Sequence, residues 1–459
     1  MSAIEHPPSS GLVPSEYHTY DSSKKPPALG HAVRPYWAFD PGYVNLNHGS
    51  YGSAPLPVMF RFTELVTLAE RNPDKFHRIT YMPLLIESRC RIADLVGARA
   101  DEIVLVTNAT HGVNEVLRNF EWREGDVLLS ATTTYGAVSR TAQYLSDRSE
   151  APRPTHHIIE YTFPMSHTEL IDRFRESIKN IKASNVNKNK FVAVIDSIVS
   201  NPGVLLPWKE LVQICKEEGI WSVIDAAHSI GQEVNINLSE AKPDFFISNC
   251  HKWLYVKRSC ALLYVPKRNQ HLIKSSIPTS HAYVSPTDSH PPPPDDVTNF
   301  VGQHECERRS LTQHEAAGES LDFRKWLGGE AVINAYCHNL AMEGGRRLAE
   351  VFGTKVMDVT GELTLNMTNV LLPLPVEKFK GEIYNSQNLV AINTVFREKL
   401  LFDWNSYAGH YFHAGGWWTR CSAQVWNEIS DFEYVSKAFI AICEDIKLTI
   451  LANHIASES

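Results

Sequence analysis

The chain has 459 residues and a mass of 51.7 kDa, which exceeds one ordinary domain, so we expect two. Its content of 43% hydrophobic and 21% charged residues excludes a wholly disordered or fibrous protein. The net charge of -8, without a dense basic cluster, argues against nucleic acid or a membrane surface as a partner. No run approaches the roughly 20 apolar residues of a membrane helix, and the first residues lack the apolar core of a signal peptide.

The eight cysteines are scattered along the chain and form no C-x-x-C pair. Several lie inside apolar runs, which favours buried, reduced thiols over disulfides or a zinc site. We therefore predict a cytoplasmic globular protein without a metal site.

Residues 1–34 are rich in proline, serine and charge and predict a disordered tail. From about residue 100 to 265, short β-branched runs alternate with amphipathic helical patterns, which predicts a doubly wound α/β domain with a mostly parallel sheet. The expected strands are 103–106, 127–130, 191–195, 221–224, 245–247 and 260–265, and the expected helices are 110–120, 170–181 and 208–218.

The C-terminal third has an α+β pattern and predicts a smaller second domain. We expect helices at 329–352 and 389–402, a strand at 363–374, a last helix opened by a capping box from Ser430 to Glu433, and a proline-rich loop at 284–298. The predicted organisation is a tail (1–34), an N-terminal segment packed with the small domain (35–75), a large domain (76–320) and the small domain (321–459).

Two polar residues follow neighbouring strands of the expected sheet. Lys252 comes after the apolar run 245–247, and Asp225 ends the run 221–224. Alone, such a lysine is usually a solvated surface residue, and such an aspartate is usually a helix cap or turn residue. One β–α–β step apart, they match the need of pyridoxal phosphate (PLP) for a lysine Schiff base and for a carboxylate on its ring nitrogen. The pair predicts a PLP site at the carboxyl edge of the sheet.

The stretch 107–112 leads from a strand into a helix and is a candidate phosphate cradle. Backbone N–H groups and the Thr110 hydroxyl would face a dianion at the positive end of the helix, although a plain N-cap is the alternative. Asn249 and His251 flank Lys252 and would complete this cradle.

Three further residues follow strands or lie between aromatic residues. Tyr135 is placed to stack on a cofactor ring, with a core tyrosine as the alternative. Ser200 is a candidate partner of the ring 3-oxygen, or a turn serine. The setting of Arg420 suits bidentate binding of a substrate carboxylate, or an interdomain salt bridge.

Six motifs carry a family resemblance over almost the whole globular length. They are LNHGSYG (46–52), NATHGVN (108–114), TTYGA (133–137), DAAH (225–228), SNCHKW (248–253) and RCSAQ (420–424). With them the chain resembles the class V aminotransferase family of fold-type I PLP enzymes. Within that family the resemblance is greatest to the fungal C–S lyases of ergothioneine synthesis, and it extends to isopenicillin N epimerase and the PLP cyclase of loline biosynthesis.

The resemblance implies a role for each matching residue, and a homodimer with the active site at the interface. Lys252 would form the Schiff base, Asp225 would pair with the pyridinium, and Tyr135 would stack and donate a proton. The other implied site residues are Thr110, His111, Ser200, His228, Asn249 and His251 for the cofactor, Arg420 for the substrate carboxylate, and Asn47 and His48 at the substrate mouth.

The reaction implied by the resemblance is cleavage of hercynylcysteine sulfoxide, an amino-acid substrate, to ergothioneine, pyruvate and ammonia. Lys252 would remove the Cα proton, and β-elimination would follow. The motifs do not separate this outcome from epimerisation or carbon–carbon bond formation, since all three share a Cα carbanion. A cysteine desulfurase would need a mobile loop cysteine, for which Cys306 is the candidate, and an impaired pseudoenzyme is a further alternative.

Two stretches depart from the family pattern. Lys257-Arg258-Ser259 stands where the family has Pro-Arg-Gly. Residues 303–319 lack the Gly-Thr-x-Asp segment whose threonine reaches the phosphate of the partner subunit, and they show no apolar period. We hypothesise a local frame error there, which sequencing of the transcript would test.

Overall fold

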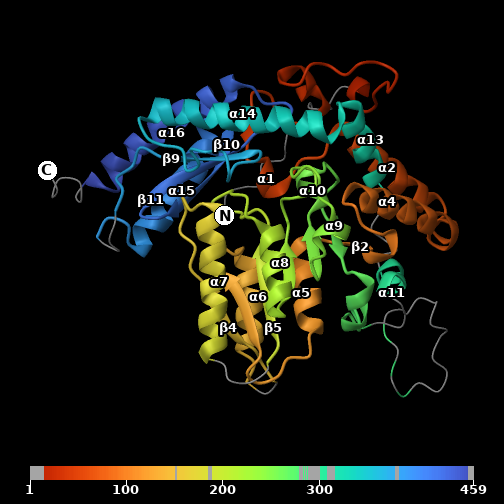
Figure 1. Cartoon of the computed structure of the whole chain (residues 1–459). Coiled ribbons are helices and arrows are strands. Elements are labelled where there is room, and N and C mark those ends of the chain that lie inside the picture. Colours follow the sequence, from red (N-terminus) through yellow and green to blue (C-terminus); the bar gives the residue numbers. More distant parts are fainter. Residues whose placement is uncertain are drawn as a thin grey trace.

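The computed structural model describes residues 15–149, 152–184, 189–278, 300–307, 316–377 and 382–452, together with positions 283, 285 and 287. Within these ranges a seven-stranded sheet from the middle of the chain stands beside a four-stranded sheet built from both ends of it (Figure 1). None of the helices in this part combines the length and the apolar character that crossing a bilayer requires.

The larger sheet has the strand order β2-β8-β7-β6-β5-β3-β4. Its strands are β2 (Ile103–Val106), β3 (Val127–Ala131), β4 (Thr155–Ile159), β5 (Phe191–Asp196), β6 (Trp221–Asp225), β7 (Phe245–Ser248) and β8 (Ala261–Tyr264). β8 runs antiparallel to both neighbours, and the other pairs are parallel. The strands that read as continuous apolar runs are buried along their whole length because both faces are covered. The predicted mostly parallel α/β sheet is confirmed.

Helices cover the two faces of this sheet and build a separate core on each. They are α5 (Ala109–Asn119), α6 (Gly136–Ser146), α7 (His167–Ser184), α8 (Trp208–Glu218), α9 (Leu238–Ala241) and α10 (Cys250–Trp253). Val116 of α5 shares one core with Val194 of β5, and Leu211 of α8 shares the other with Ile195. Adjacent residues of β5 thus point to opposite faces, as the alternation of a strand requires.

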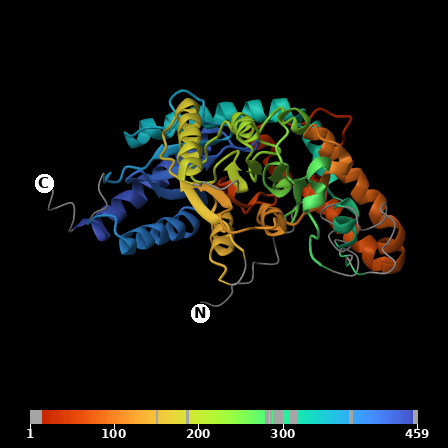
Figure 2. The ribbon, with the colours of Figure 1, turned by 60° about the horizontal axis from the view of Figure 1, so that its bottom comes forward.

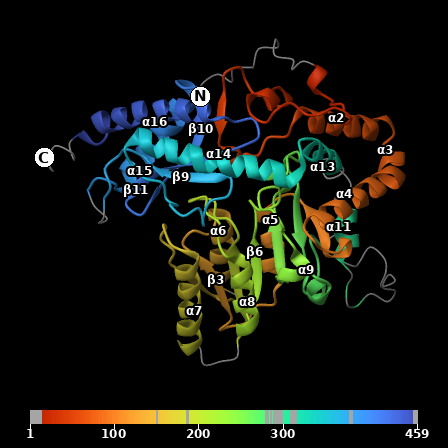
Figure 3. The ribbon, with the colours of Figure 1, turned by 45° about the horizontal axis from the view of Figure 1, so that its top comes forward.

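The smaller sheet has the order β1-β10-β11-β9. Its strands are β1 (Val44–Leu46), β9 (Met367–Leu371), β10 (Ser406–His413) and β11 (Gly416–Ser422), and the helices beside it are α14 (Gly329–Phe352), α15 (Ser386–Phe402) and α16 (Ile429–Thr449). β1 pairs with β10 in parallel, so the N-terminal segment completes a sheet of the C-terminal part. α14 continues from this sheet across the top of the molecule to α13 (Ala317–Trp326), as Figure 3 shows.

A lobe of helices projects on the opposite side of the large sheet from α15 and α16 (Figure 2). Its elements are α2 (Leu56–Arg71), α3 (Pro73–Lys75), a π-helical turn (Phe76–Thr80), α4 (Tyr81–Leu95), α11 (Phe300–Glu307) and α13, while α1 (His48–Tyr51) lies beside α10. Short 3-10 turns occupy Ser15–Tyr17, His31–Tyr36, Ala100–Glu102 and Lys267–Leu272.

α11 contains the start of the unusual stretch 303–319. Its buried His304 lies against the carboxylate of Glu115 on α5. Residues 308–315 and the side chain of Cys306 lie outside the described part, as does almost all of the proline-rich loop 284–298. The hypothesis of a frame error stays a prediction.

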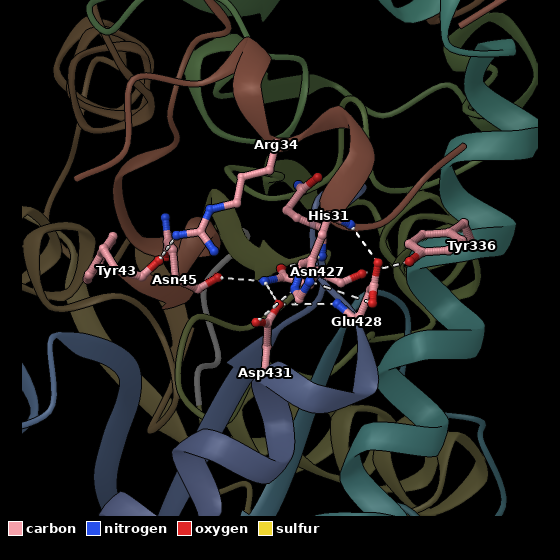
Figure 4. Close-up of polar contacts among 9 residues, drawn as sticks. His31, Arg34, Tyr43, Asn45, Tyr336, Asn427, Glu428 and Asp431 are labelled. Atoms are coloured by element: carbon pink, nitrogen blue, oxygen red, sulfur yellow. Dashed lines mark hydrogen bonds and ion pairs between the residues drawn. The ribbon is translucent and has the colours of Figure 1, made fainter. Parts of the chain in front are cut away.

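The predicted disordered tail is wrong for residues 15–34, which pack against the C-terminal helices, and residues 1–14 lie outside the described part. Val33 is fully buried in a cluster with Trp426. The His31 backbone N–H donates to Oε1 of Glu428 at 2.7 Å, and its ring Nε2 lies 3.1 Å from Oδ1 of Asp431 (Figure 4). The segment is therefore fixed to the start of α16.

The predicted capping box at Ser430 and Glu433 is also wrong. α16 begins at Ile429 with Glu428 as its N-cap, and the Glu428 backbone N–H donates to the Asp431 carboxylate at 3.1 Å. In place of the predicted strand 363–374, the structure has the shorter strand β9, Met367–Leu371. The domain boundaries remain predictions.

Candidate active site

The carboxyl ends of β2, β3, β5, β6 and β7 meet around one cavity of about 190 Å³. These strands are parallel, so the residues that follow them gather at one edge of the sheet. The polar and aromatic residues that line the cavity are Ser50, Tyr51, Asn108, Thr110, Tyr135, Asp196, Ser200, Asp225, His228, Asn249, His251 and Lys252. Most of the predicted site residues are thus brought together, whereas Asn47, His48, His111 and Arg420 lie outside this lining.

Lys252 lies on α10, the short helix that follows β7. Its Nζ is 3.0 Å from Nε2 of His228. Burial, followed by the positive charge of Arg420, lowers the pKa of Lys252 to about 7, and Asp225 opposes this shift. A large share of the amine is therefore unprotonated at neutral pH, as a nucleophile or a base requires.

α1 and Gly52, the residue that follows it, pack against the backbone of α10. Gly52 has a φ of 68°, and a Cβ there would lie 1.8 Å from the carbonyl oxygen of His251, so only glycine allows this approach. His48 Nε2 donates to the Lys252 carbonyl oxygen at 2.7 Å.

His48 is buried against Trp253, Tyr255 and Trp426, and burial lowers its pKa to about 3. The prediction that His48 lies at the substrate mouth is therefore wrong. It is a neutral side chain that anchors the lysine helix.

Two carboxylates stand side by side at the sheet edge. Asp196 ends β5 and Asp225 ends β6, and they are partners in the parallel register. Burial raises the pKa of both, and the charge of Asp225 raises that of Asp196 further. Oδ2 of Asp196 has no hydrogen-bond partner in the described part of the chain. A cation bound here would stabilise this pair, which fits the protonated ring nitrogen of PLP.

The N-terminus of α5 forms the opposite end of the cavity. Its N-cap Asn108 accepts the His111 backbone N–H at 2.8 Å. Asn249 Oδ1 accepts the Ala109 N–H at 2.8 Å, which joins the helix start to the lysine loop. Thr110 lines the cavity beside them. A helix start with an adjacent hydroxyl fits a phosphate group.

The two predicted phosphate histidines behave differently. His251 lines the cavity and donates from Nδ1 to the Cys260 carbonyl at 2.8 Å, which leaves Nε2 as the ring nitrogen for a ligand. Burial lowers its pKa to about 4. His111 instead lies against Thr107, 3.0 Å from its hydroxyl, and against Glu115, so its ring does not reach the cavity.

Arg420 lies on β11 behind the cavity lining and is almost fully buried. Its guanidinium donates to the Ser200 carbonyl at 2.6 Å, to Asn47 Oδ1 at 3.0 Å and to Ser50 Oγ at 2.7 Å. Burial lowers its pKa to about 10. Asn47 thus orients the arginine, and the pair Asn47–Ser50 holds it without a counter-charge. A substrate carboxylate would supply one.

Two tyrosines stand at the open side of the cavity. Tyr135, the residue before α6, is 51% exposed, and Tyr51, at the end of α1, is 72% exposed. Their rings are accessible to a cofactor or substrate that enters the cavity.

Asp196, Ser50, Tyr51 and Trp253 were not predicted from the sequence. Asp196 carries the same signal as Asp225, an acid at the end of an apolar run, and could have been found. Ser50 and Tyr51 lie inside the LNHGSYG motif. Trp253 ends the SNCHKW motif, but its contact with His228 exists only in the folded chain.

The comparison with known proteins identifies the family. A model of class V aminotransferases matches residues 62–283, which include Asp225 and Lys252. An L-cysteine desulfhydrase-like protein, lolT1 of Epichloe uncinata, is 32% identical over 451 residues, 93% of this chain and 98% of the relative. Hercynylcysteine sulfoxide lyase of Schizosaccharomyces pombe is 31% identical over 419 residues, 90% and 98% of the two chains. The chain belongs to the class V aminotransferase family.

Further relatives are consistent with this assignment. Isopenicillin N epimerase of Streptomyces clavuligerus is 28% identical over 340 residues, 73% of this chain and 82% of the relative. The structure of a cysteine desulfurase from Thermococcus onnurineus NA1 has a TM-score of 0.68 at 18% identity and covers 92% of this chain and 100% of that one. The predicted resemblance and the fold-type I architecture are confirmed. Class V aminotransferases are PLP enzymes, and this chain is one of them.

Proposed function

We propose that this enzyme is a C–S lyase that cleaves hercynylcysteine sulfoxide, a cysteine S-conjugate, with release of pyruvate and ammonia. Because the sulfur of this substrate is a sulfoxide, elimination leaves a sulfenic acid, and ergothioneine forms once a thiol reduces it. The observation that carries the proposal is that Lys252 and Asp225 line the same cavity. Burial there lowers the pKa of the Lys252 amine to about 7. The 31% identity to hercynylcysteine sulfoxide lyase supports the choice of substrate.

Different residues around the cavity would bind different parts of the cofactor. Lys252 would hold the cofactor through Nζ, Asp225 would face its ring nitrogen, and Thr110, Asn249 and His251 would hold its phosphate. When bound, PLP supplies an electron sink for the electrons left at the substrate Cα.

The chain's own proton transfers involve two residues. The Lys252 amine would remove the Cα proton, and the Tyr135 hydroxyl, at the open side, would protonate the leaving sulfur. Arg420 would bind the substrate carboxylate and fix the Cα–H bond toward Lys252. Ser200, which lines the cavity, would contact the oxygen substituent of the ring, and His228 would lie against the cofactor beside Lys252.

A second outcome shares these first steps. Epimerisation or carbon–carbon bond formation also begins with loss of the Cα proton, and isopenicillin N epimerase is among the relatives. A third, the desulfhydrase outcome, is suggested by the name of the lolT1 relative. A pseudoenzyme is disfavoured, since the lysine and the aspartate line one cavity and the arginine lies behind this lining, bonded to Ser200.

We also propose a homodimer. α2 and α4 carry partly exposed apolar side chains along the lobe, and α2 begins five residues after α1, whose Ser50 and Tyr51 line the cavity. These side chains are Met59, Phe60, Val66 and Leu68 on α2 and Ile86 on α4, with Ile79 on the π-helical turn between the two helices. We place the dimer in the cytoplasm: seven cysteines have described side chains, no disulfide joins them, and six are buried.

The test uses the purified protein with its near-visible spectrum and a pyruvate assay. Addition of hercynylcysteine sulfoxide should shift the cofactor band and release pyruvate. Lys252→Ala should lower this rate by about 10²-fold or more, whereas Lys325→Ala, at an exposed position of α13, should leave it unchanged. A band shift without pyruvate would favour the epimerase or cyclase. Pyruvate from L-cysteine but not from the sulfoxide would favour a desulfhydrase.

A further inference from the structure

Two contacts in series lead from a buried tryptophan through His228 to the amine of Lys252. Trp253 is fully buried, and its indole Nε1 lies 3.2 Å from Nδ1 of His228. The other ring nitrogen of His228, Nε2, lies 3.0 Å from Nζ of Lys252. Trp253 and Lys252 are adjacent in the chain, so one short helix touches both nitrogens of the same imidazole.

The indole group fixes the direction of these hydrogen bonds. An indole N–H only donates, so Nδ1 of His228 must accept and carries no proton. The proton of the neutral ring is therefore on Nε2, which donates toward Lys252. Nζ can accept this bond only as a free amine, because an ammonium group has no lone pair.

The competing arrangement contains a clash. If Lys252 were an ammonium group that donates to Nε2, the proton of the neutral ring would move to Nδ1. The Nδ1–H and the Trp253 N–H would then face each other at 3.2 Å, two donors without an acceptor. A doubly protonated His228 meets the same clash and also a second positive group, Lys252.

We propose that Trp253 is a positioning residue that fixes His228 in its Nε2–H tautomer, and so holds Lys252 as a free amine. The proposal rests on the proposed role of Lys252 as the lysine that binds the cofactor. It adds a residue that lies outside the cavity lining and makes its hydrogen bond to His228.

Other groups also act on the amine and must be held constant in a test. Arg420 from β11 disfavours the ammonium form, Asp225 from β6 favours it, and His251 faces His228 from the lysine helix itself. Substitutions at Trp253 should therefore keep the shape of the ring, because Trp253 also packs on His48 with ring centroids 5.5 Å apart.

The chain offers a matched control. Trp426 is also buried and contacts His48, but its Nε1 has no hydrogen-bond partner among the described residues. Replacement of Trp253 by β-(3-benzothienyl)alanine keeps the bicyclic shape and replaces the N–H by sulfur. The same replacement at Trp426 removes an N–H that makes no such bond. Trp253→Phe serves as a second, encodable variant.

Two readouts are measured. In cofactor-free protein with ¹⁵N-labelled histidine, the ring nitrogen shifts report the tautomer of His228, with His228→Gln used to assign the signal. In the second, the rate of PLP capture, followed by its bound absorbance, is measured against pH. Loss of the indole N–H should shift the midpoint of this profile to higher pH by about one unit, a tenfold change in the amine equilibrium.

The expected result is an Nε2–H tautomer in wild type and in the Trp426 variant, and loss of this preference with a raised midpoint in both Trp253 variants. An Nδ1–H tautomer in wild type, or an unchanged midpoint in the benzothienyl variant at 253, would overturn the proposal. Failure of wild type to capture PLP would instead overturn the proposed role of Lys252. The tautomer measurement would then decide alone whether Trp253 fixes His228 in its Nε2–H form.

Discussion

The Lys252 amine lies between Arg420, whose charge lowers its pKa, and Asp225, whose charge raises it, in a site where burial favours the neutral form. PLP capture requires the free amine, so its rate should rise with pH through about 7. Arg420→Gln removes one positive charge and should move this midpoint up by about one pH unit. Stopped-flow absorbance across a pH series measures it. Arg347→Gln makes the same chemical change on the surface of α14 and should leave the midpoint in place.

The carboxylate pair affects stability in the cofactor-free state. Burial and Asp225 raise the pKa of Asp196 above its usual 3.8, so the fold holds this proton more tightly than the unfolded chain does. Stability is then greatest below the usual pKa and falls as pH rises toward the folded value. Asp196→Asn has no proton to lose and should be more stable than wild type, by a margin that widens with pH.

Thermal unfolding of the cofactor-free protein at mildly acidic and mildly alkaline pH measures this margin. Asp172→Asn, the same chemical change at an exposed position of α7, is the control. If the stability difference between Asp196→Asn and wild type did not change with pH, the raised pKa of Asp196 would be contradicted.

The predicted site residues that the structure places in the cavity lining are mainly those with a local signal. Lys252, Asp225 and Thr110 each follow an apolar strand, and parallel strands bring such positions to one edge. The placement of His48 failed because nothing in LNHGSYG shows that the imidazole turns inward to the Lys252 carbonyl. His111 failed because the helix carries its ring away from the cavity toward Glu115.

At the scale of elements, the start of α16 distinguishes the structure from the sequence-based expectation. Glu428→Ala removes the N-cap carboxylate and the acceptor of the His31 N–H, and should lower the free energy of unfolding by about 1–2 kcal/mol. Ser430→Ala, at the predicted cap, should change it by less than about 0.5 kcal/mol, since Ser430 is exposed inside the helix. Urea unfolding of the two variants shows whether Glu428 or Ser430 caps the helix. A larger loss of stability in Ser430→Ala would support the capping box predicted from the sequence.

Central strands could be predicted closely, because burial on both faces makes them uniformly apolar. β4 was missed, as an edge strand whose sequence THHII is partly exposed. β1 has only three residues and exists through its pairing with β10, some 360 residues away along the chain. Such pairings have no local signature, so the second sheet could be expected as α+β but not traced.

At the scale of the whole molecule, the partly exposed apolar side chains of α2 and α4 require an explanation, for which we proposed a second subunit. Sedimentation should give roughly twice 51.7 kDa for wild type. Phe60→Glu places a charge on this face, where the phenyl ring is 39% exposed, and should shift the protein toward monomer and weaken PLP retention. Phe402→Glu, at an 82% exposed position at the end of α15, is the control. A monomeric wild type that retains PLP would contradict the dimer.

The contact between Asn47 and Arg420 joins positions 373 residues apart. Synthesis proceeds at about 5–20 residues per second, so the arginine emerges roughly 20 to 75 seconds after its partner. Lys252 and the strands around it are translated before Arg420. The large sheet can therefore fold while the C-terminal part of the chain is still being translated. If Lys252 and Arg420 have the roles proposed above, a nascent chain therefore has its amine in place before the arginine that would bind the substrate carboxylate has been made. Asn47 and Arg420 meet only after β10 has paired with β1 and β11 has paired with β10.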